Sequence, residues 1–311
     1  MDGYKVVLTR NGVEESFHNI NIVHSKSPES FGYFPRSAIK PFQLIPLVHE
    51  LLKKKIEIDL SEIAIFCASH SGELHHTEKV KATAEKYSLN YEDIYCEKQI
   101  PFHGETYKLL MQNNKNYTKL HNNCSGKHVG MLLFCQLLGL NSEDYQNLRH
   151  PLQQKIDLFY RDLFEVEDLF YGIDGCGLPA PYINSNTFLS AVDKLNTSKR
   201  YKESWMVVFN SFISHPEYTA GTDRVDTILM KESKDDVLIK AGAEGSMFFT
   251  DLENSTIIKC KDGSKRGIDI ASMYYGKKLG YIDNKTYSNF IRTFTHNNQN
   301  TKVAEIEIIE I

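Results

Sequence analysis

The chain has 311 residues, of which 41% are hydrophobic and 24% charged, with 18 Gly and 9 Pro. This composition supports a sizeable core and excludes collagen-like, low-complexity and wholly disordered chains. Lys and Arg total 36 against 40 Asp and Glu, a net charge of −4, so no basic excess favours nucleic acid or an anionic membrane as a dedicated partner.

No segment of the sequence is suited to insertion into a membrane. The longest apolar run, 129–135, is far shorter than the about 20 residues that a bilayer requires. The first residues lack the basic and apolar regions of a signal peptide, so we expect a cytoplasmic protein. In that reducing compartment the six cysteines indicate buried thiols, metal ligands or catalytic groups rather than disulfides.

The first part of the chain predicts a hairpin, a helix and a buried strand. The β-prone segments 4–9 and 13–18 flank an Asn-Gly dipeptide, which is typical of tight hairpin turns. A helical pattern begins near Ser37 and extends to Leu52. The short apolar run 63–67 indicates a buried strand.

The middle of the chain is predicted to be mainly helical. A strand at 170–173 enters a Gly-rich loop, and further helices extend to about 231. Before that strand, helical spacing of apolar residues covers 76–88, 104–113, 125–139, 142–148 and 152–164.

Beyond 231 the pattern returns to strands. We expect strands at 237–241, 246–250 and 256–260, followed by a closing helix over 267–280. The last eleven residues alternate loosely between apolar and charged, which fits either an edge strand or a tail.

This order of strands, helices and strands favours an α+β fold. Strands from both ends would form one sheet beside a mainly helical insertion. We expect a single intermingled unit over 1–311, with 1–72 and 232–311 as its α/β part and 73–231 as its mainly helical part.

Ser37 and Lys40 form the first candidate catalytic pair. Their i, i+3 spacing at the start of a predicted helix puts hydroxyl and amine on one face. A serine becomes a nucleophile when a base takes its proton, and a lysine can be that base when burial or nearby positive charge favours its neutral form. The alternative is a helix-capping Ser37 with a surface Lys40, because about one such spacing is expected by chance.

Two other segments could complete such a site. Ser69 follows the predicted strand at 63–67, where hydroxyl and backbone N–H groups can face an anion or a carbonyl. The alternatives there are a helix cap and a surface His70. Lys240 stands in K-A-G-A-E-G, which is similar to the K-T/S-G element that accompanies S-x-x-K in serine acyl enzymes, although a hairpin lysine is the alternative.

A third set of residues could hold a metal. Cys124, Lys127 and His128 share one helical face, and Cys176 lies between two glycines that allow its sulfur to be exposed. Cysteine and histidine are zinc ligands, but the usual C-x-x-C pair is missing. Two buried structural thiols therefore remain the alternative.

The remaining cysteines and glycines carry less information. Cys67 and Cys135 lie in apolar runs and are expected in the core, whereas Cys96 and Cys260 have no predicted role. The glycines form neither a P-loop nor a dinucleotide fingerprint, so nucleotide binding has no support.

Six blocks in a fixed order carry a resemblance to a known family. They are R-S-A-I-K-P-F-Q, C-A-S-H-S-G-E, N-C-S-G-K-H-V-G-M-L, D-G-C-G-L-P, H-P-E-Y-T-A-G-T-D-R and K-A-G-A-E-G, over about residues 30–280. The ordered set resembles the rhizobial-type L-asparaginase II family. This resemblance implies a fold similar to serine β-lactamases and β-lactamase-like glutaminases, and hydrolysis of the side-chain amide of L-asparagine to L-aspartate and ammonia.

The resemblance also implies roles for individual residues and a homodimer. The catalytic Ser–Lys pairs would be Ser37, Lys40, Ser69 and Lys240, with Lys259 as the fallback for the second lysine. A Zn²⁺ ion would be held by Cys124, Lys127 and Cys176. The substrate would contact Arg36, His128, Asp174 and Glu244.

The resulting hypothesis is a two-step acyl transfer. Lys40 takes the proton from Ser37, whose Oγ attacks the amide carbonyl, and zinc orients the substrate. A glutaminase-like amidohydrolase remains an alternative, because one methylene in the substrate is worth only about 1–3 kcal/mol. A zinc-stabilised binding protein without turnover is the other. A penicillin-binding protein or β-lactamase is disfavoured, because no S-D-N element and no export signal are present.

Overall fold

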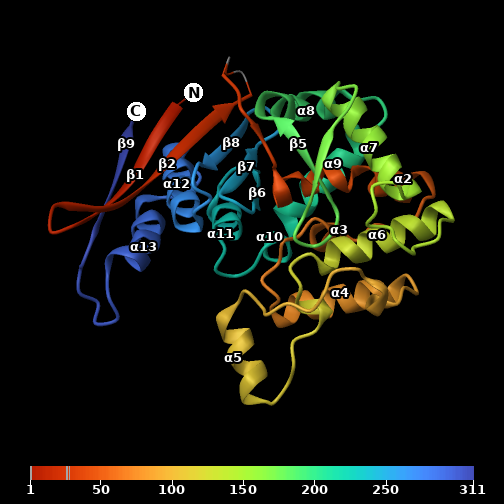
Figure 1. The fold of residues 1–311 in the computed structure, drawn as a ribbon, viewed down its shortest axis with the longest axis horizontal. Coiled ribbons are helices and arrows are strands. Elements are labelled where there is room, and N and C mark those ends of the chain that lie inside the picture. The colour runs from red at the N-terminus through yellow and green to blue at the C-terminus, as the bar shows by residue number, and fades with distance from the viewer. Residues whose placement is uncertain (1, 26, 28) are drawn as a thin grey trace.

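The main sheet of the protein combines strands from both ends of the chain (Figure 1). The computed structural model describes residues 2–25, 27 and 29–311. The six strands are antiparallel and lie in the order β6-β7-β8-β2-β1-β9. They are β1 (Asp2–Arg10), β2 (Val13–His24), β6 (Leu238–Gly242), β7 (Ser246–Thr250), β8 (Ser255–Cys260) and β9 (Glu305–Glu310). The α+β prediction is confirmed.

The predicted hairpin is the β1–β2 pair. Its turn residues, Asn11 and Gly12, have φ of 49° and 77°, which Asn and Gly adopt more readily than other residues. The last eleven residues include β9, which pairs with β1 at one edge of the sheet. The expected edge strand is therefore present.

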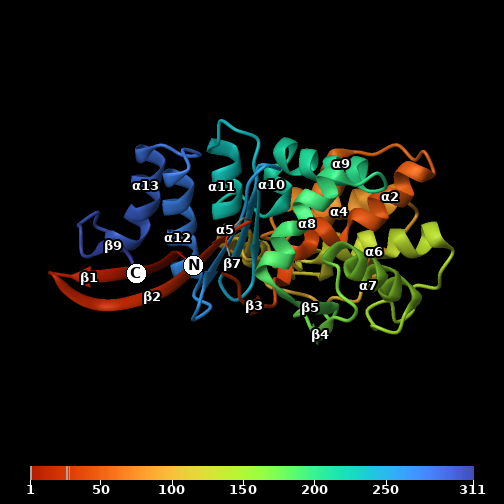
Figure 2. The ribbon, with the colours of Figure 1, turned by 90° about the horizontal axis from the view of Figure 1, so that it is seen from above.

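Helices cover both sides of this sheet. The helices α11 (Val225–Glu232), α12 (Lys265–Lys278) and α13 (Asn284–Thr295) lie together on one side (Figure 2). On the other side of β6–β8, α8 (Ser185–Thr197) packs against β2 and β8 and joins the helical part. The sequence analysis did not predict α13, although this helix covers the end of the sheet.

The helical part is built around a central helix. This helix, α3 (Leu60–Phe66), packs against α4, α6, α9 and α10. A small second sheet has the order β3-β5-β4, and its β5 packs against α8. The other elements are β3 (Gly32–Tyr33), α2 (Ile45–Lys53), α4 (Leu74–Lys86), η2 (Tyr91–Asp93), α5 (Gly104–Gln112), η3 (Lys119–His121), α6 (Ser125–Leu138), α7 (Pro151–Phe164), β4 (Phe170–Ile173), β5 (Pro179–Asn184), α9 (Lys202–Ser214) and α10 (Pro216–Thr219).

An aromatic cluster joins the sheet to the helices. The ring of Phe42 lies 5.7 Å from that of Phe248 on β7, and 5.0 and 5.6 Å from those of Phe188 and Trp205 on two helices. All four side chains are buried. Such ring pairs add about 0.5–1.5 kcal/mol each beyond their buried area. Phe42 thereby fixes the short helix that contains it, Lys40–Gln43, and the 3₁₀ turn before it, Arg36–Ile39.

The helix predicted from Ser37 to Leu52 is broken into three pieces. A 3₁₀ turn, η1 (Arg36–Ile39), leads into α1 (Lys40–Gln43) and then α2. Pro lies in the first turn of both α1 and α2, where its missing N–H costs no hydrogen bond and its ring opposes a longer preceding helix. The break places Ser37 on the 3₁₀ turn and Lys40 on the next helix.

The strand predicted at 63–67 is wrong, because these residues lie in α3 and its C-cap. A short apolar run fits a helix buried on all faces as well as a buried strand. The side chain of Asp59 accepts a 2.8 Å hydrogen bond from the backbone N–H of Ser61, which caps the helix. This capping residue is the signal in the sequence that favours a helix over a strand at 63–67.

The helix predicted at 142–148 is also wrong, because the structure has turns there. Asn141 and Asn147 accept hydrogen bonds from backbone N–H groups two residues on, which favours turns over a helix. The other predicted helices and strands are present with boundaries close to the expected ones. Among the described residues, no helix is both long and apolar enough to cross a membrane.

Candidate active site

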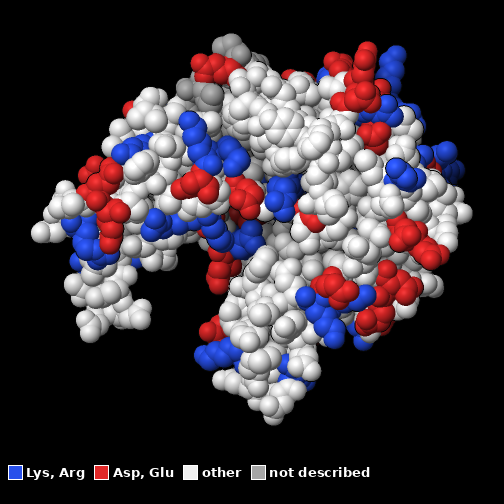
Figure 3. Space-filling view, viewed as in Figure 1, with Lys and Arg blue, Asp and Glu red and all other residues white. Residues whose placement is uncertain are grey.

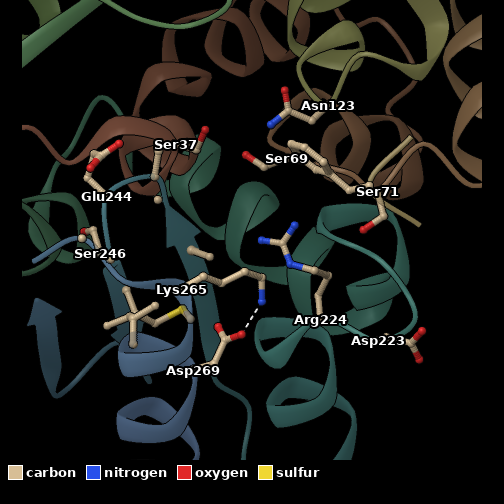
Figure 4. A pocket seen from close by; sticks show the side chains of 18 of the residues that line it. Ser37, Ser69, Ser71, Asn123, Asp223, Arg224, Glu244, Ser246, Lys265 and Asp269 are labelled. Carbon is tan, nitrogen blue, oxygen red and sulfur yellow. Dashed lines mark hydrogen bonds and ion pairs between the residues drawn. The ribbon is translucent and has the colours of Figure 1, made fainter. Parts of the chain in front are cut away.

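A cavity of about 560 Å³ opens where the sheet meets the helical part. This volume lies in the range of about 300–1,000 Å³ that small-molecule sites occupy. Figure 3 shows the surface hollowed between the sheet side and the segment that carries α5, with Lys and Arg beside the hollow. Three of the predicted site residues, Ser37, Ser69 and Glu244, line the cavity. Figure 4 shows the two serines on the same side of it.

Lys40 is buried behind these serines and is not a surface residue, with 1% of its area exposed. Its Nζ donates to Ser69 Oγ at 3.0 Å, to Cys124 Sγ at 3.3 Å and to the carbonyl oxygen of Ala68. The backbone N–H of Lys40 donates to the carbonyl oxygen of Ser37, but within the described chain no hydrogen bond joins their side chains, and Ser37 does not cap a helix. The structure therefore brings Lys40 to the second serine, Ser69, rather than to its neighbour in sequence.

Ser69 is held in place by its backbone. Its N–H donates to the carbonyl oxygen of Thr219 at 2.9 Å, and the N–H of Ser71 donates to that of Ala220 at 2.7 Å. His70, between them, is fully buried with Nε2 2.9 Å from Ser125 Oγ, so it is not a surface histidine. Burial lowers the pKa of His70 well below its usual value. The segment is therefore fixed, with Ser69 and Ser71 at the cavity.

Lys240 lies behind the opposite wall, on the edge strand β6. Its Nζ donates to the carbonyl oxygen of Ala241 at 2.9 Å and lies 3.9 Å from Asp226 Oδ2. Burial lowers its pKa to about 7, against the opposing effect of Asp226. A Cβ on Gly242 would approach Pro35 O to 2.3 Å, so glycine lets β6 lie close to the turn that carries Ser37.

Lys259, the fallback for the second lysine, is placed differently. Its Nζ donates to the carbonyl oxygens of Glu244 at 2.5 Å and Cys260 at 2.8 Å. It does not line the cavity. Neither Lys240 nor Lys259 forms a hydrogen bond to a predicted catalytic serine within the described residues.

Cys124, Lys127 and Cys176 form a buried group that we call the thiol–lysine cluster. Lys127 Nζ lies 3.0 Å from Cys176 Sγ. A hydrogen bond from the Cys124 thiol, together with the charge of Lys127, lowers the pKa of Cys176 to about 5. The same shared proton and burial raise the pKa of Cys124. One thiolate, one thiol and one ammonium therefore meet in the interior.

Three of the predicted substrate contacts lie around this cluster and do not line the cavity. Arg36 Nε donates to Asp174 Oδ1 at 2.7 Å, and Asp174 Oδ2 lies 3.9 Å from Lys127 Nζ. Burial opposes ionisation of Asp174, but Lys127 and Arg36 hold its pKa at about 2. His128 Nδ1 lies 2.5 Å from the Tyr145 hydroxyl, and burial lowers the pKa of His128 to about 3.

The family of the chain follows from a comparison with known proteins. A model of the L-asparaginase II family matches residues 6–308, nearly the whole chain. The chain belongs to the L-asparaginase II family. A search of curated proteins gave no match. Membership confirms the resemblance carried by the six sequence blocks and indicates an amidohydrolase of the L-asparaginase type that acts on a small-molecule amide.

Two observations indicate that the thiol–lysine cluster of this L-asparaginase II chain could hold a zinc ion. Two sulfurs and one amine are donors that zinc accepts, and they already lie together without C-x-x-C spacing. Beside them, His128 Nε2 is buried and has no hydrogen-bond partner in the described residues. Buried polar atoms of this kind call for a ligand, an ion or a water.

The sequence analysis missed several residues of the site. Cys96 is buried near the cluster. Burial raises the pKa of its thiol, and the neighbouring Cys124 and Cys176 raise it further. Arg224, Lys265 and Asp269 line the cavity, and Lys265 pairs with Asp269. Of these features, the sequence shows only the i, i+4 spacing of Lys265 and Asp269, which is compatible with an ion pair on a helix. Cys67 and Cys135 are buried in the core as predicted.

Among the residues that the structure describes, two other groups of side chains could hold a metal ion. They are His18, Cys260 and Asp262, and Glu73, His75 and His76. In the first, the ring nitrogens of His18 contact Asp262 at 2.7 Å and Arg266 at 3.0 Å. In the second, Glu73 accepts two hydrogen bonds from Thr222. His18, Asp262 and Glu73 are thus engaged within the fold, whereas His75 Nε2 is buried without a hydrogen-bond partner in the described residues. We place neither group in the active site, because neither includes a residue of the proposed catalytic or zinc-binding set.

Proposed function

We propose that the protein hydrolyses the side-chain amide of L-asparagine to L-aspartate and ammonia through a serine acyl-enzyme. One observation supports this most directly. The two predicted catalytic serines, Ser37 and Ser69, line one cavity, and the buried amine of Lys40 contacts Ser69 at 3.0 Å. A serine, a second hydroxyl and an amine are the parts that acyl transfer requires.

In the proposed first step, Ser37 Oγ attacks the amide carbon. Its proton passes through Ser69 Oγ to the amine of Lys40, which contacts Ser69 and does not itself line the cavity. Lys40 has to lose its own proton before it can act as this base. Lys40 then gives the proton to the leaving ammonia. Water attacks the aspartyl ester by the same proton path, which releases L-aspartate and restores Ser37.

Lys240 acts on this path by charge. At neutral pH it is partly protonated, since its pKa lies at about 7. A charge at this position acts on the groups that carry the proton path, because Lys40 and Lys240 interact electrostatically. Glu244, on the cavity wall, is the predicted substrate contact best placed to meet the substrate directly.

Cys124, Lys127 and Cys176 would hold a Zn²⁺ ion in this proposal. Bound zinc would supply a fixed positive charge beside Lys40 and help to position the substrate. Arg36, His128 and Asp174 surround these ligands and would orient them. Because Lys127 must lose a proton to bind a metal, zinc affinity should rise with pH.

Ammonia release tests the proposal. We expect the wild type to release ammonia from L-asparagine, and Ser37→Ala to lower kcat by at least about 10³-fold, because the nucleophile is lost. Quenched mass spectrometry should find an aspartyl ester on Ser37. Ser246→Ala is the matched control, since this cavity serine has a hydroxyl without a partner in the described residues.

The same assay separates the alternatives. Faster release from L-glutamine would make the protein a glutaminase. An ester on Ser69 would exchange the roles of the two serines. A protein that binds zinc but releases no ammonia from either amide would be the binding protein without turnover, and the proposal would be wrong.

A further inference from the structure

The guanidinium group of Arg224 faces the cavity, and the described residues around it balance its positive charge only in part. Arg224 lines the cavity, and its side chain is 20% exposed. Its side chain forms no hydrogen bond to any residue that the structure describes. The nearest carboxylate there is Asp226, with Oδ1 3.9 Å from Arg224 Nε. Figure 4 shows the guanidinium pointing into the cavity, on the side that faces Ser69.

The other permanent cation among the lining residues, Lys265, differs from Arg224. Its amine pairs with Asp269, as the dashed line in Figure 4 shows. Asp226, in contrast, lies 3.9 Å both from Arg224 Nε and from Lys240 Nζ. One carboxylate thus serves two cations, which leaves the outer N–H groups of Arg224 available to a further anion.

The backbone holds Arg224 firmly in this position. Thr222 donates from its backbone N–H and its hydroxyl to the Glu73 carboxylate, at 2.9 and 2.6 Å. The N–H of Gly221 donates to Thr227 Oγ1 at 3.2 Å, and that of Arg224 to the carbonyl oxygen of Gly221 at 3.1 Å. A Cβ on Gly221 would approach Ser71 Oγ to 2.4 Å, so only glycine lets this turn pack there. A backbone fixed in advance removes part of the entropy that the site would otherwise lose when Arg224 binds a ligand.

We propose that Arg224 binds the α-carboxylate of the substrate and selects amino-acid amides over amides that lack this group. The inference rests on the proposed function for the reaction itself. A guanidinium matches a carboxylate with two parallel hydrogen bonds, which a lysine does not reproduce. In asparagine two carbons separate the α-carboxylate from the side-chain carbonyl, so one cavity can hold both the carboxylate at Arg224 and the carbonyl at the serines.

The test compares two substrates that differ only in this carboxylate. L-asparagine and 3-aminopropanamide, which is asparagine with hydrogen in place of the carboxylate, are assayed by ammonia release. The wild type should prefer asparagine in kcat/KM, and Arg224→Ala should reduce that preference by about 10- to 100-fold, the value of a hydrogen-bonded charge pair. Most of the loss should appear in KM. Arg224→Lys should retain only part of the preference.

Lys265→Ala is the matched control, because it removes the cavity cation that Asp269 already occupies. It should keep the wild-type preference. Equal losses on both substrates in Arg224→Ala would show a structural role and overturn the inference, and so would an unchanged preference. If Arg224→Ala does not fold, Arg224→Lys decides by the same comparison.

Calorimetric titration with L-aspartate separates this inference from the proposed function. Binding that Arg224→Ala loses, in a protein that releases no ammonia, supports the inference and refutes the reaction. If the protein releases ammonia and Arg224→Ala keeps the full preference for asparagine, the proposed reaction is supported and the role of Arg224 is refuted. A wild type that neither binds L-aspartate nor discriminates between the two amides overturns the inference.

Discussion

Lys127 and Lys240 are both buried near the proposed catalytic serines, yet their surroundings shift the pKa values of the two amines in opposite directions. Lys127 is 2% exposed and lies 3.0 Å from Cys176 Sγ and 3.9 Å from Asp174 Oδ2. Burial alone would lower its pKa, but Cys176, Cys124 and Asp174 raise it above the usual value.

Lys240 is 0% exposed and has one carboxylate, Asp226, at 3.9 Å. Arg224 competes for the same carboxylate, and Lys40 adds a further repulsive charge. Burial therefore prevails, and the pKa of Lys240 falls to about 7.

The difference shows that neighbouring charges decide whether the effect of burial on the pKa of a lysine prevails or is overcome. The thiol–lysine cluster, with its Cys176 thiolate and the Asp174 carboxylate beside it, is suited to hold a cation. The wall around β6 carries excess positive charge and is suited to proton transfer and to binding an anion. Lys40 links the two regions: its Nζ contacts Cys124 of the cluster, and its charge acts on Lys240 of β6.

The largest expected effect comes from the lysine that joins the two regions. Lys40→Met removes the proposed base and should lower kcat on L-asparagine by about 10²–10⁴-fold. Zinc content, measured by mass spectrometry of the purified protein, should stay at the wild-type level, because Lys40 is not one of the proposed ligands. Loss of zinc with retained turnover would instead place Lys40 with the cluster.

Removing one sulfur of the cluster should give the next largest effect. Cys176→Ala takes away a proposed ligand and should weaken zinc binding by more than about 100-fold, a loss that competition with a chelator measures. Cys135→Ala is the matched control, since this thiol is also buried but lies in the core of α6. Equal zinc affinity in the two variants would refute the metal assignment.

Much of the fold could be predicted from local patterns. The Asn-Gly turn fixed the hairpin, and the return of strand patterns after 231 indicated a sheet made from both ends of the chain. The run 63–67 could not be assigned, because periodicity does not distinguish a buried helix from a buried strand.

The site was predictable as a set of residues but not as a set of contacts. The motifs identified Ser37, Lys40 and Ser69, yet the i, i+3 spacing suggested that Lys40 meets Ser37. The break between η1 and α1, together with the packing of α3, brings Lys40 to Ser69 instead. Arg224 lay within a recognised block, but its unpaired charge depends on where Asp226 and Lys240 meet in space.

The smallest expected effect is a pH dependence of the free energy of unfolding, which tests the comparison of Lys127 with Lys240. The folded pKa of Lys240 lies at about 7, below the unfolded value of about 10.5. Between these values the unfolded chain binds more protons than the folded one, so stability rises with pH. The cost of burying this lysine is therefore full below pH 7 and disappears as pH approaches 10.5.

Lys240→Met/Asp226→Asn isolates this contribution, because the asparagine amide oxygen could still accept from the N–H of Ala241, which now donates to Asp226 at 3.2 Å. Urea unfolding at pH 6 and pH 9 should show the wild type gaining about 2–3 kcal/mol relative to the double variant, since each fully titrating proton contributes about 1.4 kcal/mol per pH unit. Lys234→Met, at an exposed lysine, should show no such gain. A constant difference between wild type and double variant would mean that Lys240 stays charged, and that the two buried lysines are alike after all.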